Sequence, residues 1–174
     1  MRLRAAAFCL GIWVMGTVCI SVAATQNFYT IDRLLAAGGH PSFAEGVDRL
    51  GAPAARDLLR YLSSELNRLY FRNWNLVQIP LGGVTLWLVL GPPADRRLRW
   101  LVGAMLAIAV ILTVVVTPPI VSVGRSLDFV PRDPPPPSLA TFGILHAAYT
   151  MLEMLKAAMG TCAAWWICRA AGSR

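Results

Sequence analysis

The sequence LRWLVGAMLAIAVILTVVV, residues 98–116, is apolar throughout apart from Arg99 near its start and a single Thr near its end. A helix needs about 20 mostly apolar residues to cross a bilayer, so this stretch predicts a membrane-spanning helix. Further apolar runs lie at residues 5–24, 74–90 and 139–167. We therefore predict an all-α, polytopic membrane protein whose four transmembrane helices form a bundle.

The overall composition agrees with lipid as the main solvent. The chain has 174 residues, of which 56% are hydrophobic and only 14% charged, whereas soluble domains carry about a quarter charged residues. Four spans and their connections use nearly the whole chain, which predicts one membrane domain, residues 1–174. The net charge of +7 does not indicate nucleic acid, because the basic residues form no stripe. The expected partners are the lipid bilayer and either another membrane protein or a second copy.

Two arginines, Arg2 and Arg4, precede the first apolar run, as in a first transmembrane helix with its N-terminus inside the cell. A secretory signal peptide has a similar layout, and Ser21-Val22-Ala23 resembles a cleavage site. The run is longer than the apolar core of a signal peptide, about 7 to 15 residues, which favours an uncleaved helix. Cleavage is the alternative, and it would leave three spans.

The long connection between the first two spans contains a second helical pattern. Arg56, Arg60 and Asn67 lie opposite an apolar face of a helical wheel. This predicts an amphipathic helix at residues 54–72, in the first outer loop, that lies on the membrane surface or packs across the mouth of the bundle. Packing against the protein's own bundle is the expected arrangement. The apolar face consists of Leu58, Leu59, Leu62, Leu66, Leu69 and Tyr70.

The other connections differ in stiffness and charge. Residues 91–97 form a short basic turn between the second and third spans. The connection to the fourth span ends in four consecutive prolines, 134–137, which favour an extended, stiff spacer. Within it, the sequence GRSLDFVP at residues 124–131 is too particular for a spacer, although its pattern assigns it no role. Arginines are densest in the short segments beside the chain ends and in the basic turn, which predicts cytoplasmic termini.

The fourth span carries the ionisable residues that lie deepest in a predicted helix. His146, Thr150, Glu153, Ala157 and Gly160 follow helical spacing along one stripe. We expect the polar stripe to face the bundle, because polar groups are costly in lipid. Tyr149 and Lys156 flank this stripe, and the opposite side shows Ile144, Ala148, Met151, Leu155 and Met159.

A charge at the middle of the membrane costs a few kcal/mol, about 2.5 to 3.5 on the mildest scales, so Glu153 should be protonated or paired. Lys156 at i+3 is the nearest cation, and Tyr149 at i−4 is a hydrogen-bond donor. In the second span, Asn75 and Gln78 share one face, which predicts that this helix faces the fourth. The cluster is either interhelical glue or a polar pocket for a proton, a ligand head group or a cofactor.

No cofactor is predicted. His146 is the only histidine within a span, since His40 lies in a Gly-Gly-His-Pro turn. A haem with two histidine ligands therefore does not fit one chain, although methionine ligation or a dimer would still allow haem. One His and one Glu also fall short of the three or more protein ligands of typical metal sites. The four cysteines lie in apolar runs and are expected to behave as small hydrophobic residues.

Three motifs resemble a known family. They are RNWNLVQ at residues 72–78, TPPI at 117–120 and LHAAYTMLE at 145–153. Together they are similar to an uncharacterised bacterial four-helix membrane family, domain of unknown function 4149, which is itself similar to eukaryotic transmembrane protein 205. The resemblance implies a four-helix fold in the bacterial inner membrane and supplies no activity or catalytic residues.

Three kinds of function are compatible with these patterns. The first is a non-enzymatic binding or assembly subunit with an internal polar site. The second is a membrane redox or cofactor-binding enzyme with His146 as ligand or general base and Glu153 as its partner. The third is a proton or solute pathway formed by an oligomer. The sequence contains no phosphate-binding glycine loop and no hydrolase nucleophile elbow, so the first kind is preferred.

Overall fold

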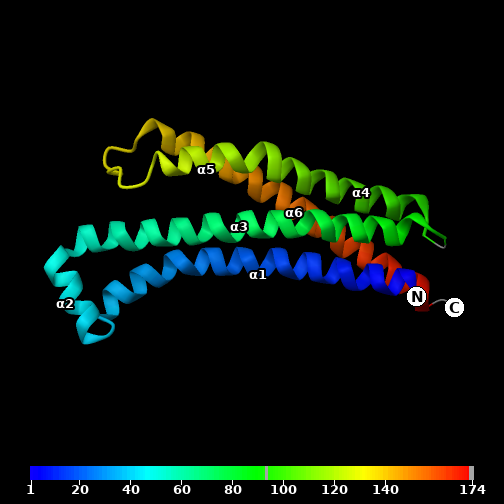
Figure 1. The fold of residues 1–174 in the computed structure, drawn as a ribbon, viewed down its shortest axis with the longest axis horizontal. Coiled ribbons are helices and arrows are strands. Elements are labelled where there is room, and N and C mark those ends of the chain that lie inside the picture. Colours follow the sequence, from blue (N-terminus) through cyan, green and yellow to red (C-terminus); the bar gives the residue numbers. More distant parts are fainter. Residues whose placement is uncertain (93, 173–174) are drawn as a thin grey trace.

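The computed structural model describes residues 1–92 and 94–172, and every regular element in these ranges is helical. This confirms the predicted all-α class. The described elements, shown in Figure 1, are α1 (Arg2–Ala37), α2 (Pro41–Leu50), α3 (Ala52–Leu90), α4 (Arg96–Ile111), the π-helical segment η1 (Leu112–Val116), α5 (Thr117–Arg125) and α6 (Pro137–Gly172).

Four long rods run alternately up and down, and the continuous helix from α4 through η1 to α5 forms the third rod (Figure 1). Each rod packs closely against two others, in the cyclic order α1, α3, α4, α6. The helices α3 and α6 are therefore diagonal across the bundle. The expectation that the second span packs directly against the fourth was wrong, and only long side chains from the two helices meet at the centre.

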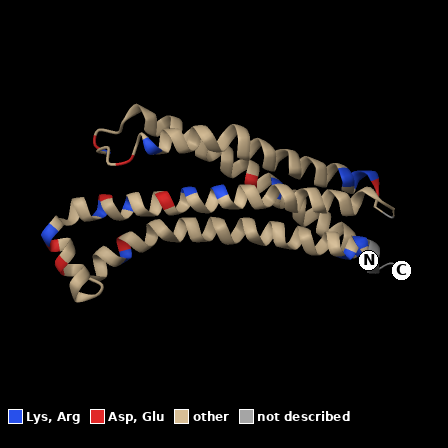
Figure 2. Cartoon of the chain, viewed as in Figure 1, with Lys and Arg blue, Asp and Glu red and all other residues tan. Residues whose placement is uncertain are grey.

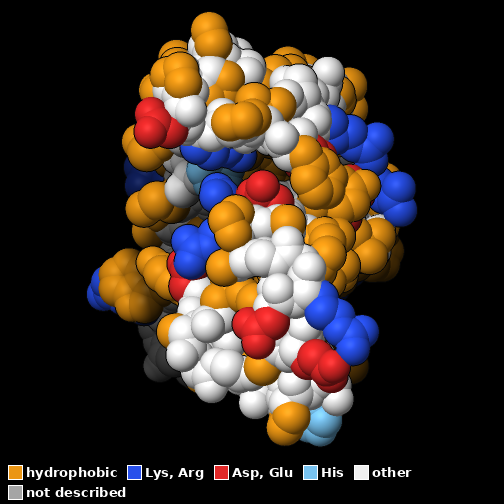
Figure 3. Space-filling model, turned by 90° about the vertical axis from the view of Figure 1, so that its left-hand side faces the viewer, with side chains coloured by type: hydrophobic (Ala, Val, Ile, Leu, Met, Phe, Trp, Pro, Cys, Tyr) orange, Lys and Arg blue, Asp and Glu red, His pale blue; other side chains and the backbone are white. Residues whose placement is uncertain are grey.

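The two ends of the bundle differ in charge. We call the end with the N- and C-termini the termini end, and the end with α2 and the connection from α5 to α6 the distal end (Figure 1). Charged residues gather at both ends and, on α3, extend from the distal end towards the middle; between them lies a belt of the ribbon almost free of charge (Figure 2). Seen from the distal end, side chains of both charges lie beside apolar ones (Figure 3).

The helix α3 is longer than predicted. Residues 54–72 do not form a separate helix on the membrane surface or across the bundle mouth, because they continue into the second predicted span as one 39-residue helix. Residues 52–90 contain no break between the predicted amphipathic helix and the predicted second span, and Pro80 is accommodated inside the helix. At about 1.5 Å per residue, α3 is about 58 Å long and extends well beyond a bilayer core of about 30 Å.

The distal part of α3 packs on α1 through small and polar residues. Ser63 donates a hydrogen bond to the Asn27 carbonyl, and Asn27 donates to the Asn67 side chain over 2.7 Å. The leucine face was expected to pack against the bundle, and this holds only in part: Leu59, Leu66 and Tyr70 are half-buried, but the hydrogen-bonding groups occupy the centre of the contact with α1. A leucine stripe instead faces outward; its members and their exposed fractions are Leu58 (49%), Tyr61 (39%), Leu62 (55%) and Leu69 (42%).

The segment at residues 124–131 is tied to α3 by charge. Arg68 contacts Glu65 at 2.5 Å and Asp128 at 2.9 Å, and we call these three residues the distal clasp. Burial alone would lower the pKa of the Arg68 guanidinium, but its hydrogen bonds to Asp128 and Glu65 outweigh burial and raise that pKa. Leu127 is buried, and Phe129 contacts Tyr61 with ring centroids 5.0 Å apart. The segment is therefore a docked connection, which explains its particular sequence.

The interior changes character along its length. Towards the termini end it is apolar, with Leu10, Leu98, Val102 and Ile167 among its buried side chains. Further towards the distal end, buried polar residues replace this apolar core. Two helical stretches, Arg2–Ala37 and Arg96–Arg125, are long and apolar enough to cross a membrane by length and composition.

Candidate functional site: a polar centre shared by four helices

The side chain of Gln78 is the hub of the buried polar residues. Its Oε1 accepts a hydrogen bond from Trp13 Nε1 on α1 over 2.8 Å and another from Lys156 Nζ on α6. Its Nε2 donates to Asn75 Oδ1 over 3.2 Å. Gln78 is completely buried, so these contacts replace the water that its amide would otherwise bind. One amide thus connects the diagonal helices α3 and α6, and α1 as well.

Asn75 extends the network towards the distal end. Its Oδ1 also accepts a hydrogen bond from Tyr149 over 3.0 Å, and its Nδ2 donates to Thr117 Oγ1 over 2.9 Å. Thr117 in turn donates from Oγ1 to the Leu112 carbonyl over 2.7 Å. The network therefore reaches the third rod too, and side chains from all four rods are joined in one set of hydrogen bonds.

The local sequence places Thr117 at this position. Pro118 and Pro119 have no N–H groups, so carbonyls one turn earlier lose their usual helical partners. The backbone N–H of Thr117 bonds the Leu112 carbonyl five residues earlier, which widens the helix into the π-helical segment η1. Such bulges are frequent at functional sites. Here the bulge aims the Thr117 hydroxyl at the polar centre.

An ion pair lies next to this hub. Glu153 Oε1 and Lys156 Nζ are 2.6 Å apart, and their side chains are only 9% and 1% exposed. Their i, i+3 spacing on α6 makes the contact local, so folding of the helix alone brings the charges together. The second carboxylate oxygen, Oε2 of Glu153, is buried and has no hydrogen-bond partner among the residues that the structure describes. It is the one open position on this carboxylate.

The structure brings together five of the seven residues singled out from the sequence, and the hydrogen bonds above join them: Asn75, Gln78, Tyr149, Glu153 and Lys156. The other two, His146 and Thr150, lie on the exposed side of α6, so their expected inward orientation was wrong. The Thr150 hydroxyl bonds the His146 carbonyl within the helix, which satisfies it without the bundle. His146 stacks on Phe142 with ring centroids 5.8 Å apart.

The rotation of α6 has a physical reason. Tyr149 and Lys156 are long enough to reach the amides of α3 across the diagonal, whereas Thr150 is not. The inward face of α6 is consequently the line of Tyr149, Glu153, Lys156, Gly160 and Ala163, all buried. The side with Ile144, Met151 and Leu155 is exposed, as the sequence predicted.

Two residues of the network were not predicted. Trp13 lies in the middle of an apolar span, where an indole is usually assigned to packing, although its N–H requires a partner when buried. Thr117 follows the third predicted span directly and stands before two prolines, a position that favours a connection over a buried contact. A polar group inside an apolar run, at the depth of other polar groups, is the signal that would have indicated both.

The helices around the centre are closely packed. A Cβ atom at Gly82 would lie 2.6 Å from Cη2 of Trp13 and 2.8 Å from Cδ1 of Leu106. Small residues of this kind allow membrane helices to approach closely. Within the described residues no group of three or more His, Cys, Asp or Glu is placed to hold a metal ion. What the centre offers chemically is a water-poor set of hydrogen bonds with one open carboxylate oxygen.

Comparison with protein-family models, with curated proteins and with solved structures finds no match to this chain, so the family resemblance of its motifs stays a prediction.

Proposed function

We propose that the chain crosses the membrane four times, with both termini on the cytoplasmic side. The belt between the two charged ends supports this arrangement, because the only charged residues within it are Glu153 and Lys156, which neutralise each other. The belt is set by residues 73–90 of α3, at whose distal limit Trp74 bonds Thr17 and Asn75 bonds both Thr117 and Tyr149. On the other rods it therefore comprises about residues 5–18, 100–118 and 148–168. These stretches have 14 to 21 residues, against the about 20 that a span needs, and residues 19–31, 119–124 and 138–147 continue the other three rods without Asp, Glu, Lys or Arg.

The polar residues of α3 and α6 do not argue against crossing. Asn75, Gln78, Glu153 and Lys156 lower the mean hydropathy of these two helices, but all four are buried inside the bundle. The outer surfaces of the same stretches are apolar, with exposed side chains that include Leu76, Val77, Val84, Ile144, Met151 and Leu155. The lipid-facing surfaces of α3 and α6 are therefore as apolar as those of the other rods.

The proposed orientation rests on arginine density. The termini end carries six arginines and one acid among the described residues, whereas the distal end carries eight arginines mixed with seven acids over a much longer stretch. Three of the termini-end arginines lie over tryptophan rings, Arg2 over Trp87 among them at 5.2 Å, as expected at a membrane interface. A short, predominantly basic end is typical of the cytoplasmic side.

Cysteine labelling tests the topology. In a variant that retains only the native Cys168, an impermeant maleimide added to intact cells should label nothing until the cells are opened. A variant with Arg132→Cys as its only cysteine should be labelled from outside. Labelling of both positions on one side would mean that α6 does not cross.

Within this arrangement we propose a binding or assembly role without catalysis, and the leucine stripe is the observation that carries it. Leu62 precedes Asn73 by 11 residues, which places it about 16 Å beyond the belt. Arg56, Asp57 and Arg60 lie on the same helical stretch, so this part of α3 is in water. Exposed apolar patches that cannot reach lipid mark interaction sites with other proteins.

Photo-crosslinking tests the docking role. A photoreactive amino acid at Leu62 in native membranes should give one dominant adduct, and its mass distinguishes a second copy of this chain from a different membrane protein. The same group at Ser64, on the polar flank of the helix, is the matched control. A second pair of variants, Leu62→Glu and Ser64→Glu, should show that only the former removes the adducted complex. Equal crosslinking at both positions would refute the docking role.

Proton uptake at Glu153 is a second candidate function, favoured by its open Oε2 atom. The hydrogen-bonded side chains from Thr117 through Asn75 and Gln78 to Lys156 connect this region to the distal half of the bundle. Reconstituted protein should then carry a proton flux that Glu153→Gln abolishes and Tyr149→Phe reduces. A flux that is unchanged by Glu153→Gln would remove this candidate.

A further inference from the structure

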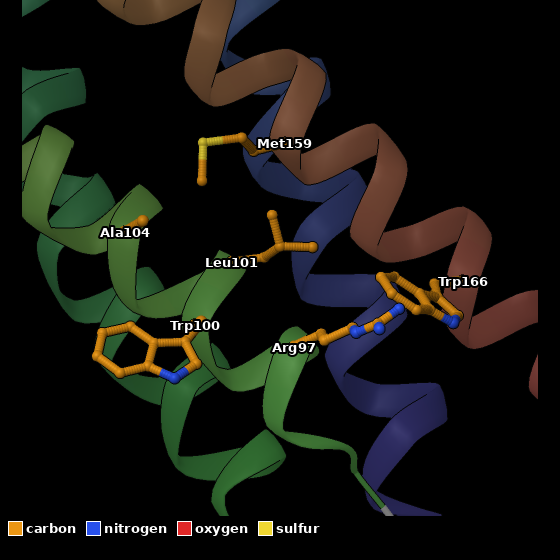
Figure 4. A pocket seen from close by; sticks show the side chains of 6 residues that line it. All are labelled: Arg97, Trp100, Leu101, Ala104, Met159 and Trp166. Carbon is orange, nitrogen blue, oxygen red and sulfur yellow. The ribbon is translucent and has the colours of Figure 1, made fainter.

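A groove on the outside of the bundle lies between α4 and α6 at the termini end (Figure 4). Its hollow measures about 480 Å³, within the range of about 300 to 1,000 Å³ typical of small-ligand sites. It therefore has room for part of an acyl chain and not for a whole lipid. Its walls consist of Arg97, Trp100, Leu101 and Ala104 from α4, and Met159 and Trp166 from α6.

The groove has one charged residue, Arg97, at the end nearest the termini. Its guanidinium lies 5.8 Å from the centre of the Trp166 ring. Arg97 takes part in none of the ion pairs formed by the described residues. Its charge is therefore available to an anion from outside the protein.

The lining of the groove changes from charged to apolar along the helix axis. Ala104 lies seven residues beyond Arg97, or about 10 Å deeper into the proposed bilayer. Met159 lies across the groove from Ala104, and Leu101 lies between them and Arg97 (Figure 4). A ligand that satisfies both ends must carry an anionic group and a hydrocarbon chain about 10 Å apart.

We propose that this groove binds an anionic phospholipid of the cytoplasmic leaflet, with its phosphate at Arg97 and one acyl chain against Leu101, Ala104 and Met159. The inference rests on the proposed four-span arrangement, which places Arg97 at the level of lipid head groups. Basic positions between membrane helices on the cytoplasmic side are suited to anionic head groups. A free phosphate ion would leave the apolar wall of the groove without an occupant.

Native mass spectrometry of the full-length protein in detergent tests the proposal, with phosphatidylglycerol and phosphatidylcholine added in parallel. The wild type should retain phosphatidylglycerol preferentially. Arg97→Gln should weaken that binding about fivefold, the effect of one basic residue near a head group. Arg96→Gln is the matched control, since it removes the same charge on the same turn but does not line the groove.

Two further variants test the part of the groove that would hold the acyl chain. Ala104→Phe fills the groove and should reduce binding of both lipids, whereas Ala107→Phe on the exposed side of α4 should leave both unchanged. Equal effects of Arg96→Gln and Arg97→Gln, or equal retention of the two lipids by the wild type, would overturn the proposal. Competition by inorganic phosphate would also overturn it, because it would identify a site for the head group alone.

Cysteine labelling of the same preparations separates this test from that of the four-span arrangement. If Cys168 and Arg132→Cys label on opposite sides and lipid selectivity is still absent, the groove assignment is wrong and the topology stands. If the two positions label on one side, the topology itself is wrong.

Discussion

Replacing Lys156 with methionine tests the polar centre most directly. Methionine keeps most of the volume of the side chain but removes the cation 2.6 Å from Glu153. Because both side chains are nearly inaccessible, the carboxylate would be left buried with neither oxygen paired. Removing one partner of a buried ion pair costs about 3 to 5 kcal/mol. Gln78 would still accept its bond from Trp13, so no further cost is expected there.

A second substitution distinguishes the charge effect from a general loss of packing. Glu153→Gln in the Lys156→Met background removes the unpaired charge, so the double variant should recover most of the loss and remain within about 1 to 2 kcal/mol of wild type. Unfolding by sodium dodecyl sulfate in mixed micelles, followed by tryptophan fluorescence, measures both differences, and Trp13 reports from the site itself. If the double variant is as unstable as Lys156→Met alone, the ion pair is not what stabilises the centre.

Two further variant pairs test the packing and the distal clasp. Gly82→Ala should lower the free energy of unfolding by about 1 to 3 kcal/mol because its Cβ collides with the rigid Trp13 indole; Gly83→Ala, with no atom within 4 Å of its Cβ, should lose nothing in the same titration. Arg68→Ala removes charged hydrogen bonds that are worth about 1.5 to 3 kcal/mol together and should make residues 124–131 susceptible to protease, whereas Arg125→Ala, exposed and 3.8 Å from its carboxylate, should have little effect. Equal cleavage in both arginine variants would show that the clasp does not hold this segment. Because the pKa of Arg68 is raised, its contribution should persist into alkaline solution, and protease resistance that declines on moderate alkalisation would contradict that charge assignment.

At the distal end, the helical spacing of apolar residues did not predict which face of the helix is buried. The leucines at helical spacing correctly predicted a helix, but not which of its faces is buried. Ser63 and Asn67 pack on α1 because they find hydrogen-bond partners there, and that places Leu58 and Leu62 outside. Periodicity identifies two faces of a helix, while the neighbouring helix decides which of them is buried.

The sequence by itself determined the properties that belong to a single segment. Apolar length predicted the helices, and the i, i+3 spacing of Glu153 and Lys156 brought the two charges into contact. Only the tertiary structure decided which polar groups meet across helices, because such contacts depend on the rotation and depth of four rods at once. That is how Trp13 and Thr117 joined the centre while His146 turned away from it. Side-chain reach, which local patterns do not report, set the rotation of α6.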